Sequence, residues 1–382
     1  MSDRPLSRLR ILEVGHMLAG PYCGMLLADL GAEVIKIEMP PGGDIARSTG
    51  KHRIGDSTTY FASLNRGKKS VALDLASAEG RAAFHALVAT ADGVITNLRP
   101  GAIRKLGLDY ATLGAVNPRI ACLALTGFGL TGPYADRPAY DYIIQAMMGL
   151  MALTGDPGGT PTKTGYSVVD NSAGIMAALG LVAMIHGGKG GQADVSLYDV
   201  MISQMNYLAA DYLNAAEVPQ RQHSGSHPFF VPAQIFATAD GHLAIFISHD
   251  RFWQVFCDAV GQPGWKVDPA FATMAARDAN RVPVLAALSA LLRGRTTQEW
   301  VDLLEPVGIV IAGVSTLDHA LDSDLTRARG MVVDIALDDG TLRLVGSPIL
   351  IEGSSPDYRR APRLGEHTAH LAGQTAGRPH AV

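Results

Sequence analysis

The stretch Arg10-Ile-Leu-Glu-Val14, continued by Gly15-His-Met-Leu-Ala-Gly20-Pro21 and later by Glu33-Val-Ile-Lys-Ile-Glu38, indicates the fold of this chain. The first and last of these segments are short apolar runs rich in β-branched residues, as buried strands are. Between them, Tyr22–Leu30 has the composition of a helix, and Gly31 follows as a stop signal. A strand, a helix and a second strand form a βαβ unit, which opens a parallel sheet.

The alternation of strands and helices continues for about two hundred residues. We expect further strands at Val71–Leu75, Gly93–Leu98, Ile120–Leu125 and Ala193–Leu197, and helices at Ala78–Thr90, Asp141–Ala152, Gly174–Ile185 and Tyr198–Ala216. This order predicts an α/β protein with a Rossmann-like, doubly wound parallel sheet. The spacing of Gly15, Gly20 and Gly24 does not match the dinucleotide fingerprint G-x-G-x-x-G, which disfavours a nicotinamide cofactor.

The character of the sequence changes near Glu217, where a polar, turn-rich linker begins. Beyond it we expect a hairpin around Asp240-Gly241, helices at Asp250–Val260, Arg281–Arg293 and Thr297–Glu305, and β-structure over Gly330–Glu352 with a turn at Asp339-Gly340. The expected organisation is a large domain over residues 1–216, a smaller α+β domain with its linker over 217–326, and a C-terminal segment, 327–382, that returns to the large domain.

Composition narrows the class of function. The 382 residues are 47% hydrophobic and carry a net charge of −4, which favours a globular protein and argues against nucleic acid as the main partner. The three cysteines are too scattered for a disulfide framework, and the N-terminus lacks the apolar core of a signal peptide. The apolar run Gly174–Ile185 is shorter than a membrane span. We expect a cytoplasmic protein with no membrane partner, and the histidine spacing predicts no metal site.

A single carboxylate precedes that apolar run, in Gly165-Tyr-Ser-Val-Val-Asp170-Asn-Ser-Ala-Gly174. The run predicts a buried helix, so Asp170 is expected at the helix start beside free backbone N–H groups. Aspartate is a common N-cap residue, and the pattern by itself leaves two interpretations open, a structural cap or a catalytic carboxylate.

Basic residues gather near the predicted strand ends, where a parallel sheet places its ligand crevice. They are Arg47, Lys51, Arg53, Arg66, Lys68, Lys69, Arg99, Arg104 and Lys105. They suit either a ligand with several phosphates or a solvated basic face. Arg99 precedes Pro100, which suits a helix start, so Arg99 and the helix N–H groups could receive a phosphate or an adenine edge. His16 follows a strand end and is either a crevice residue or a structural histidine.

An ordered set of motifs resembles the class III CoA-transferases (CaiB/BaiF type), a family that includes formyl-CoA transferase, the carnitine CoA-transferase group and the α-methylacyl-CoA racemases. The matching segments span residues 6 to 370 and are Leu12–Pro21, Gly31–Glu38, Asn65–Ser70, Arg99–Gly101, Gly127–Gly129, Thr131–Pro133 and Leu364–His367. The resemblance implies that Asp170 is a nucleophile that carries CoA covalently, through mixed-anhydride and aspartyl-CoA thioester intermediates. It also implies an interlocked homodimer, with CoA entering as a co-substrate and no permanently bound cofactor.

The same resemblance implies which residues meet the substrates. Tyr60 would lie near the acyl end, and His227 near the acceptor acid unless it is a structural loop residue. The expected CoA contacts are Met17, Leu18, Ala19, Leu73, Asn97, Leu98, Lys105, Arg137, Pro138, Ala139 and Tyr140, to which the basic cluster adds Arg99 and Arg104.

Departures from the family pattern bear on the substrate. Leu18 stands where formyl-CoA transferase has glutamine, and Ser224–Pro232 does not match that enzyme's glycine-rich loop, so formyl-CoA and oxalate are not expected as substrates. The segments Ser226–Gln234 and Thr238–Gly241 resemble members that use succinate or glutarate.

Three other functions remain open. Racemases carry Gly-His-Asp where this chain has Ala139-Tyr140-Asp141, and a tyrosine with a usual pKa of about 10 is a poor proton-transfer group near neutrality, which disfavours racemisation. A nicotinamide-dependent oxidoreductase would explain the βαβ opening but lacks the glycine fingerprint. A non-catalytic CoA-binding protein would keep the basic crevice without turnover.

Overall fold

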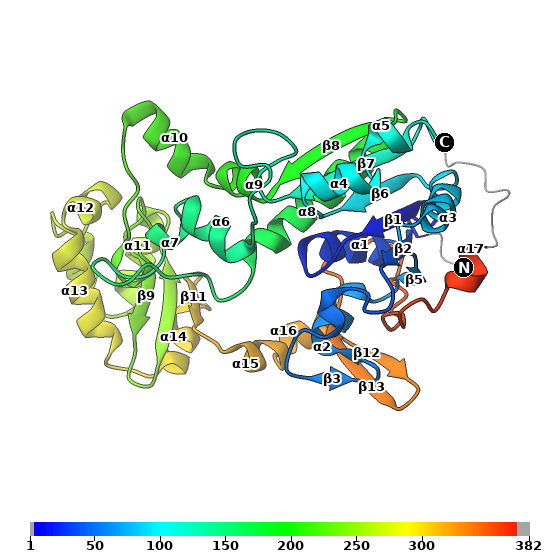
Figure 1. The fold of residues 1–382 in the computed structure, drawn as a ribbon. Helices are drawn as coiled ribbons and strands as arrows, with labels where there is room; N and C mark the ends of the chain where they lie inside the picture. The colour runs from blue at the N-terminus through cyan, green and yellow to red at the C-terminus, as the bar shows by residue number, and fades with distance from the viewer. Residues whose placement is uncertain (1–3, 373–382) are drawn as a thin grey trace. The chain divides into compact units, whose positions relative to one another are not determined.

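The computed structural model describes residues 4–372, and the chain packs into two compact units (Figure 1). The large unit combines the chain up to Met148 with Gly165–Ala210 and the chain from Ser323 onward. The small unit combines Gly149–Thr164 with Asp211–Asp322.

A six-stranded parallel sheet forms the centre of the large unit, in the order β5-β2-β1-β6-β7-β8. The strands are β1 Arg10–Val14, β2 Glu33–Glu38, β5 Lys69–Ala72, β6 Gly93–Thr96, β7 Ala121–Thr126 and β8 Gly191–Ser196. In chain order this arrangement is the 3-2-1-4-5-6 pattern of a Rossmann-type sheet, which confirms the predicted doubly wound fold. The order reverses between β1 and β6, which pair from Ile11–Gly93 to Val14–Thr96.

Helices cover both faces of this sheet. On one face, α1 (Ala19–Asp29) and α8 (Val168–His186) pack against each other and against the strands. On the other face, an apolar core joins the strands to α3 (Ala78–Val88), α4 (Pro100–Leu106) and α5 (Tyr110–Leu113). Leu371 of α17 (Thr368–Ala372) completes that core. Pro100 is at the start of α4, as expected from its fixed φ angle.

Helix α8 is longer than predicted and begins before Asp170. Its N-cap is Ser167, so Asp170 lies inside the first turn, and the interpretation of Asp170 as the N-cap is wrong. Glycine at position 174 lets α8 approach α1 closely, because a Cβ there would lie 2.9 Å from the carbonyl oxygen of Ala19. Among the described residues, α8 is the one helix whose length and composition would allow it to cross a membrane, a test that the core helices of soluble proteins also pass.

Several connections differ from the sequence expectations. The polar stretch 40–59 contains a short 3-10 helix, η1 (Ile45–Arg47), and a two-stranded hairpin, β3 (Arg53–Ile54) with β4 (Ser57–Thr58), before α2 (Thr59–Asn65). The predicted helix over 141–152 is broken: α6 (Asp141–Met147) ends before Gly149, whose φ of 91° is left-handed, and α7 (Leu150–Leu153) follows in the small unit.

The predicted helix over 198–216 is likewise two helices, α9 (Leu197–Gln204) and α10 (Asn206–Ala215). The Asn206 side chain accepts a hydrogen bond from Tyr207 N at 2.6 Å, a local bond that competes with the helical ladder.

The end of the described chain closes the β5 edge of the sheet. After the antiparallel hairpin β12 (Val332–Leu337) and β13 (Gly340–Val345), the chain runs back along β5. Ser70 N donates to His367 Nδ1 at 3.2 Å, His367 N donates to Ser70 O at 2.9 Å, and Ala72 N donates to Thr368 Oγ1 at 2.9 Å. These bonds satisfy backbone groups that an edge strand would otherwise expose.

The small unit is an α+β structure around a three-stranded antiparallel sheet in the order β11-β10-β9. The predicted hairpin is confirmed as β9 (Ala233–Ala237) and β10 (His242–Phe246), whereas β11 (Val310–Gly313) was not predicted. The other elements are η2 His223–Gly225, α11 Asp250–Ala259, η3 Pro263–Lys266, α12 Met274–Ala279, α13 Arg281–Leu292, α14 Thr297–Leu304 and α15 Leu317–Leu321, and α16 Asp324–Ala328 follows in the large unit. The core of the small unit contains Trp253, Phe256 and Trp300.

Candidate active site

At the point where the strand order reverses, between β1 and β6, the side chain of Asn97 connects the two strand ends. Asn97, directly after β6, accepts a hydrogen bond from His16 N at 2.9 Å and donates one to His16 O at 2.8 Å. Gly15 and Gly20 allow this approach, because a Cβ at either position would lie 2.7 Å and 3.0 Å, respectively, from Asn97 side-chain atoms. The loop between β1 and α1 is therefore held against the end of β6.

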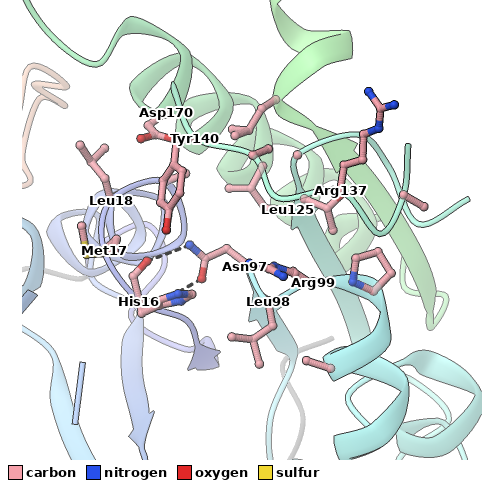
Figure 2. A pocket seen from close by; sticks show the side chains of 18 residues that line it. His16, Met17, Leu18, Asn97, Leu98, Arg99, Leu125, Arg137, Tyr140 and Asp170 are labelled. Carbon is pink, nitrogen blue, oxygen red and sulfur yellow. Dashed lines mark hydrogen bonds between the residues drawn. The ribbon is translucent and has the colours of Figure 1, made fainter. Parts of the chain in front are cut away.

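A cavity of about 340 Å³ opens beside this contact, and Figure 2 shows His16, Asn97 and Asp170 among its lining residues. Ten of the predicted CoA or substrate residues line the cavity together with Asp170: His16, Met17, Leu18, Ala19, Asn97, Leu98, Arg99, Arg137, Ala139 and Tyr140. The remaining wall comes from Pro100, Ala102, Leu125, Thr126, Gly127, Ala135 and Leu197. Sequence reasoning did not single out these seven residues as site residues, although Thr126-Gly127 follows directly on a strand end.

A second cavity of about 250 Å³ adjoins the first, since His16 and Leu98 line both. Leu73 lies here, with Leu75, Leu106 and Ile37. The two cavities follow the carboxyl ends of β2, β1 and β6, which is where a doubly wound sheet binds its ligand.

Other predicted contacts lie outside both cavities. Pro138 and Lys105 are exposed, and Arg104 is an exposed side chain 3.8 Å from the Asp136 carboxylate. Arg137, by contrast, lines the first cavity, and its guanidinium stacks 3.9 Å above the Tyr134 ring.

Most of the inner basic residues are paired within the fold. Arg47 binds Glu38, Arg66 binds Asp29, Lys68 binds Glu13 and Lys69 binds Glu33. Arg66 and Lys68 are buried with their carboxylate partners and so belong neither to a phosphate-binding face nor to a solvated one, whereas the side chain of Lys69 stays 35% exposed.

Asp170 is partly buried in the first turn of α8, and its neighbour Asp141 organises that turn. Asp141 Oδ2 accepts hydrogen bonds from Val169 N at 2.8 Å and Asp170 N at 3.3 Å, and its Oδ1 accepts one from Gln145 Nε2 at 2.6 Å. The backbone N–H groups of Val169 and Asp170 are thus occupied, which contradicts the expectation that they are free. Sequence reasoning missed Asp141 as a site residue, and its place directly after Tyr140 was the available signal.

The electrostatic environment favours the neutral form of Asp170. Burial, and secondarily the charge of Asp141, raise the pKa of Asp170 to about 7. Burial also raises the pKa of Tyr60 to about 12, with smaller contributions from the charges of Asp170 and Asp44. Tyr60 therefore lies within electrostatic range of Asp170, although its side chain lines neither cavity.

His227 belongs to the small unit and lies among aromatic rings, with centroids 4.8 Å from Phe230 and 5.9 Å from Phe246. Arg281 donates to the carbonyl oxygens of His227 and Pro228, at 3.0 Å and 2.9 Å, and so fixes this loop. Burial and the charge of Arg281 lower the pKa of His227, which favours the neutral imidazole.

Comparison with known proteins identifies the class to which this fold and cavity belong. The model of CoA-transferase family III matches residues 6–368, so the chain is a member of that family and is a CoA-transferase. This confirms the resemblance stated from the motifs.

Individual relatives are similar over nearly their whole length. The succinate–glutarate CoA-transferase of Agrobacterium fabrum is 36% identical over 379 residues, covering 96% of this chain and 94% of that protein. The acetyl-CoA:oxalate CoA-transferase of Acetobacter aceti is 34% identical, covering 96% and 95%. A crystal structure of a CaiB/BaiF family protein from Brucella suis has a TM-score of 0.85 at 34% identity and covers 97% of this chain and 99% of that chain.

Proposed function

We propose that this CoA-transferase moves CoA from an acyl-CoA thioester to a short dicarboxylic acid, with Asp170 as the covalent carrier. The observation that carries the proposal is the position of Asp170, a partly buried carboxylate with a raised pKa that lines the cavity at the strand ends. A carboxylate with a raised pKa is a stronger nucleophile once ionised, and perturbed groups in a cleft are typical of catalytic sites. The relatives named above act, by their names, on succinate, glutarate and oxalate.

The chemistry proceeds in two symmetrical halves. An Asp170 oxygen attacks the thioester carbon, the C–S bond breaks, and CoA leaves as a thiolate beside the mixed anhydride. The thiolate then attacks the Asp170 carbonyl carbon and releases the donor acid as a carboxylate, which leaves an aspartyl-CoA thioester. The acceptor carboxylate repeats the sequence in reverse, so the new thioester departs and Asp170 is regenerated. No proton or electron is consumed overall.

The cavity walls suit the coenzyme in this scheme. Leu18, Ala19 and Leu98 offer apolar contacts to the pantetheine arm leading to Asp170, whereas Arg99 and Arg137 offer charge to its phosphates. The adjoining cavity at Leu73 and Leu106 offers an apolar place for the adenine. Tyr60 would stand near the acyl carbon.

We also propose that the protein is a homodimer in the cytoplasm. Ile175, Met176 and Leu179 are 50%, 41% and 62% exposed along one face of α8, and such an apolar face favours association with a second copy. The three cysteines are buried free thiols, which fits a reducing compartment. Sedimentation analysis tests the dimer: a mass of one chain at micromolar concentration would contradict it.

The test of the function is a trapping experiment. The protein is incubated with succinyl-CoA without acceptor and then with hydroxylamine, which converts an enzyme thioester into a hydroxamate that peptide mass spectrometry locates. We expect the hydroxamate on Asp170 and none in Asp170→Ala or with free CoA alone. CoA transfer by Asp170→Ala at the wild-type rate would overturn the mechanism.

A panel of acids then defines the acceptor. Succinate and glutarate are compared with acetate and butyrate, and products are read by mass spectrometry. Dicarboxylates should exceed the monocarboxylates by at least about tenfold in kcat/KM, because a second carboxylate contributes a charged contact. Equal rates would reject the dicarboxylate assignment and leave the transferase intact. Incubating a branched acyl-CoA in deuterated water should give no exchange at the α-carbon, which separates this function from a racemase.

A further inference from the structure

The loop between β1 and α1, which lines the proposed CoA cavity, contains a strained residue. Met17 has a φ of 65°, in the left-handed region that non-glycine residues rarely adopt. Such a conformation persists only where the surroundings hold it. Asn97 holds the neighbouring His16 backbone, but it makes no hydrogen bond to Met17.

The group that holds Met17 is the carboxylate of Asp44, from the loop after β2. Asp44 is 4% exposed, and its Oδ1 accepts hydrogen bonds from Met17 N at 3.0 Å and Ala46 N at 2.9 Å. Its Oδ2 lies 2.8 Å from Lys36 Nζ. Burial works to raise the pKa of Asp44, but the charge of Lys36 and these hydrogen bonds outweigh it and keep the pKa below its usual value, so Asp44 stays ionised.

Lys36 extends the support to the start of the same loop. Its ammonium donates to Gly15 O at 2.9 Å and to Glu13 Oε1 at 2.7 Å. Lys36 and Glu13 are fully buried, so electrostatic interactions between them and Asp44 are strong. Removing Asp44 therefore takes one negative charge away from a buried ion-pair network.

Asp44 also connects this loop to the helix that carries Tyr60. It caps η1 through Ala46 N, and Ala46 O accepts a hydrogen bond from Thr58 Oγ1 at 2.8 Å. Thr58 is in turn the N-cap of α2, accepting from Phe61 N at 3.1 Å, and Tyr60 is the second residue of that helix. One buried carboxylate thus orders two segments, the Met17 loop and the start of α2.

We infer that Asp44 is a positioning residue of the CoA-transfer site: it holds the Met17 backbone in its left-handed conformation and so shapes the loop for the acyl-CoA. The inference rests on the proposed function and names no new reacting group. Its consequence is that Asp44 and Met17 act as one unit, so that the effect of losing Asp44 depends on which residue occupies position 17.

A double-mutant cycle tests that dependence. The effect of Asp44→Ala on the KM for acyl-CoA is measured in three backgrounds: wild type, Met17→Gly and Met17→Ala. Glycine at position 17 accepts a positive φ without strain. Alanine also removes most of the methionine side chain, but it keeps the strain. We expect Asp44→Ala to raise the KM for acyl-CoA at least about tenfold alone and with Met17→Ala, but less than about threefold with Met17→Gly. The KM of the acceptor acid should change little. Equal losses in all three backgrounds would overturn the inference.

Hydrogen exchange gives a second readout that needs no turnover. In Asp44→Ala the amide of Met17, resolved on peptides covering residues 15–22, should exchange at least about tenfold faster, because its buried acceptor is gone. Unchanged exchange would reject the role of Asp44. If the wild-type protein transfers no CoA to any acid, the proposed function fails, while this measurement still decides the inference.

Two further substitutions, Asp44→Asn and Asp44→Ser, keep the test decisive if Asp44→Ala does not fold. Asp44→Asn keeps an oxygen that can accept from Met17 N, so it should retain the acyl-CoA KM within about threefold while lowering Tm through the lost charge pair with Lys36. If Asp44→Ala does not fold, Asp44→Ser replaces it in the cycle, because its hydroxyl stops short of the Met17 amide. A KM in Asp44→Asn as high as in Asp44→Ala or Asp44→Ser would contradict the positioning role.

Discussion

Asp141 and Asp170 meet through the backbone of α8, where Asp141 Oδ2 accepts a hydrogen bond from Asp170 N at 3.3 Å while the two carboxylates repel each other electrostatically. The same Asp141 oxygen fixes Val169 N at 2.8 Å, so the first turn of α8 cannot rotate freely. Asp141 therefore does two things: it orients the proposed nucleophile, and it opposes the ionisation of that nucleophile.

The first prediction concerns the pH dependence of Asp170 acylation. The reactive form is the carboxylate, and its pKa is raised to about 7, so the rate of the first half-reaction should rise with pH and level off above about 7. Single-turnover trapping of the aspartyl-CoA thioester between pH 5 and 9 measures this. A rate that stays constant down to pH 5 would show that Asp170 is fully ionised there.

The second prediction separates the charge of Asp141 from its hydrogen bonds. Asp141→Asn removes the repulsion but keeps an oxygen for Val169 N and Asp170 N, so the acidic limb of the same profile should move to lower pH with a modest change in the plateau rate. Asp141→Ala removes both effects and should lower the plateau at least about tenfold. If the acidic limb of the acylation rate–pH profile stays at the same pH in Asp141→Asn, burial alone sets the pKa of Asp170.

The third prediction is about stability. Because the folded-state pKa of Asp170 lies above the unfolded value, the native state binds the extra proton between about pH 4 and 7, and the wild type loses stability as pH rises through that interval. Asp170→Asn removes this loss. It should therefore raise Tm by a few degrees at pH 8, corresponding to about 1–2 kcal/mol after allowing for partial exposure, and by much less at pH 4. Equal Tm gains at both pH values would contradict the assignment.

The fourth prediction compares two glycines of α8. At Gly174 a Cβ would lie 2.9 Å from Ala19 O and 3.0 Å from Tyr22 Cδ1, whereas at Gly180 the nearest atom is 3.8 Å away. Gly174→Ala should cost about 1–3 kcal/mol through overpacking despite the better helix propensity of alanine. Gly180→Ala is the matched control and should stabilise by about 0.5–1 kcal/mol. Denaturant unfolding measures both, and similar values would mean that α1 and α8 pack loosely.

The inner strands β1, β6 and β7 of the central sheet could be predicted because they are buried along their whole length and read as continuous apolar runs. Ile11, Leu12 and Ile35 are fully buried, and strands β1 and β2 have the predicted bounds. In contrast, β11 (Val310–Gly313) is short and largely exposed, and its apolar content gives no alternation that would distinguish it from a loop.

The site was predicted less completely because its contacts join distant parts of the sequence. Asp141 reaches Val169 across 28 positions, and Lys68 reaches Glu13 across 55. No local pattern shows that Lys68 faces a buried glutamate rather than a ligand. The family resemblance named Asn97, and the strand-end position made His16 a candidate; both line the cavity at the carboxyl ends of β1 and β6, where a parallel sheet brings such residues together.

The hydrogen bonds between β5 and the segment around His367 form late in the synthesis of the protein. Strand β5 leaves the ribosome early, yet the groups that satisfy its open edge, such as His367 N and Thr368 Oγ1, belong to a segment almost three hundred positions later. The edge of β5 therefore stays unpaired during most of the synthesis of the chain. At about 5–20 residues per second this lasts tens of seconds. A chain that stopped before residue 365 would lack these partners, and the edge of β5 would stay open to pairing with other strands.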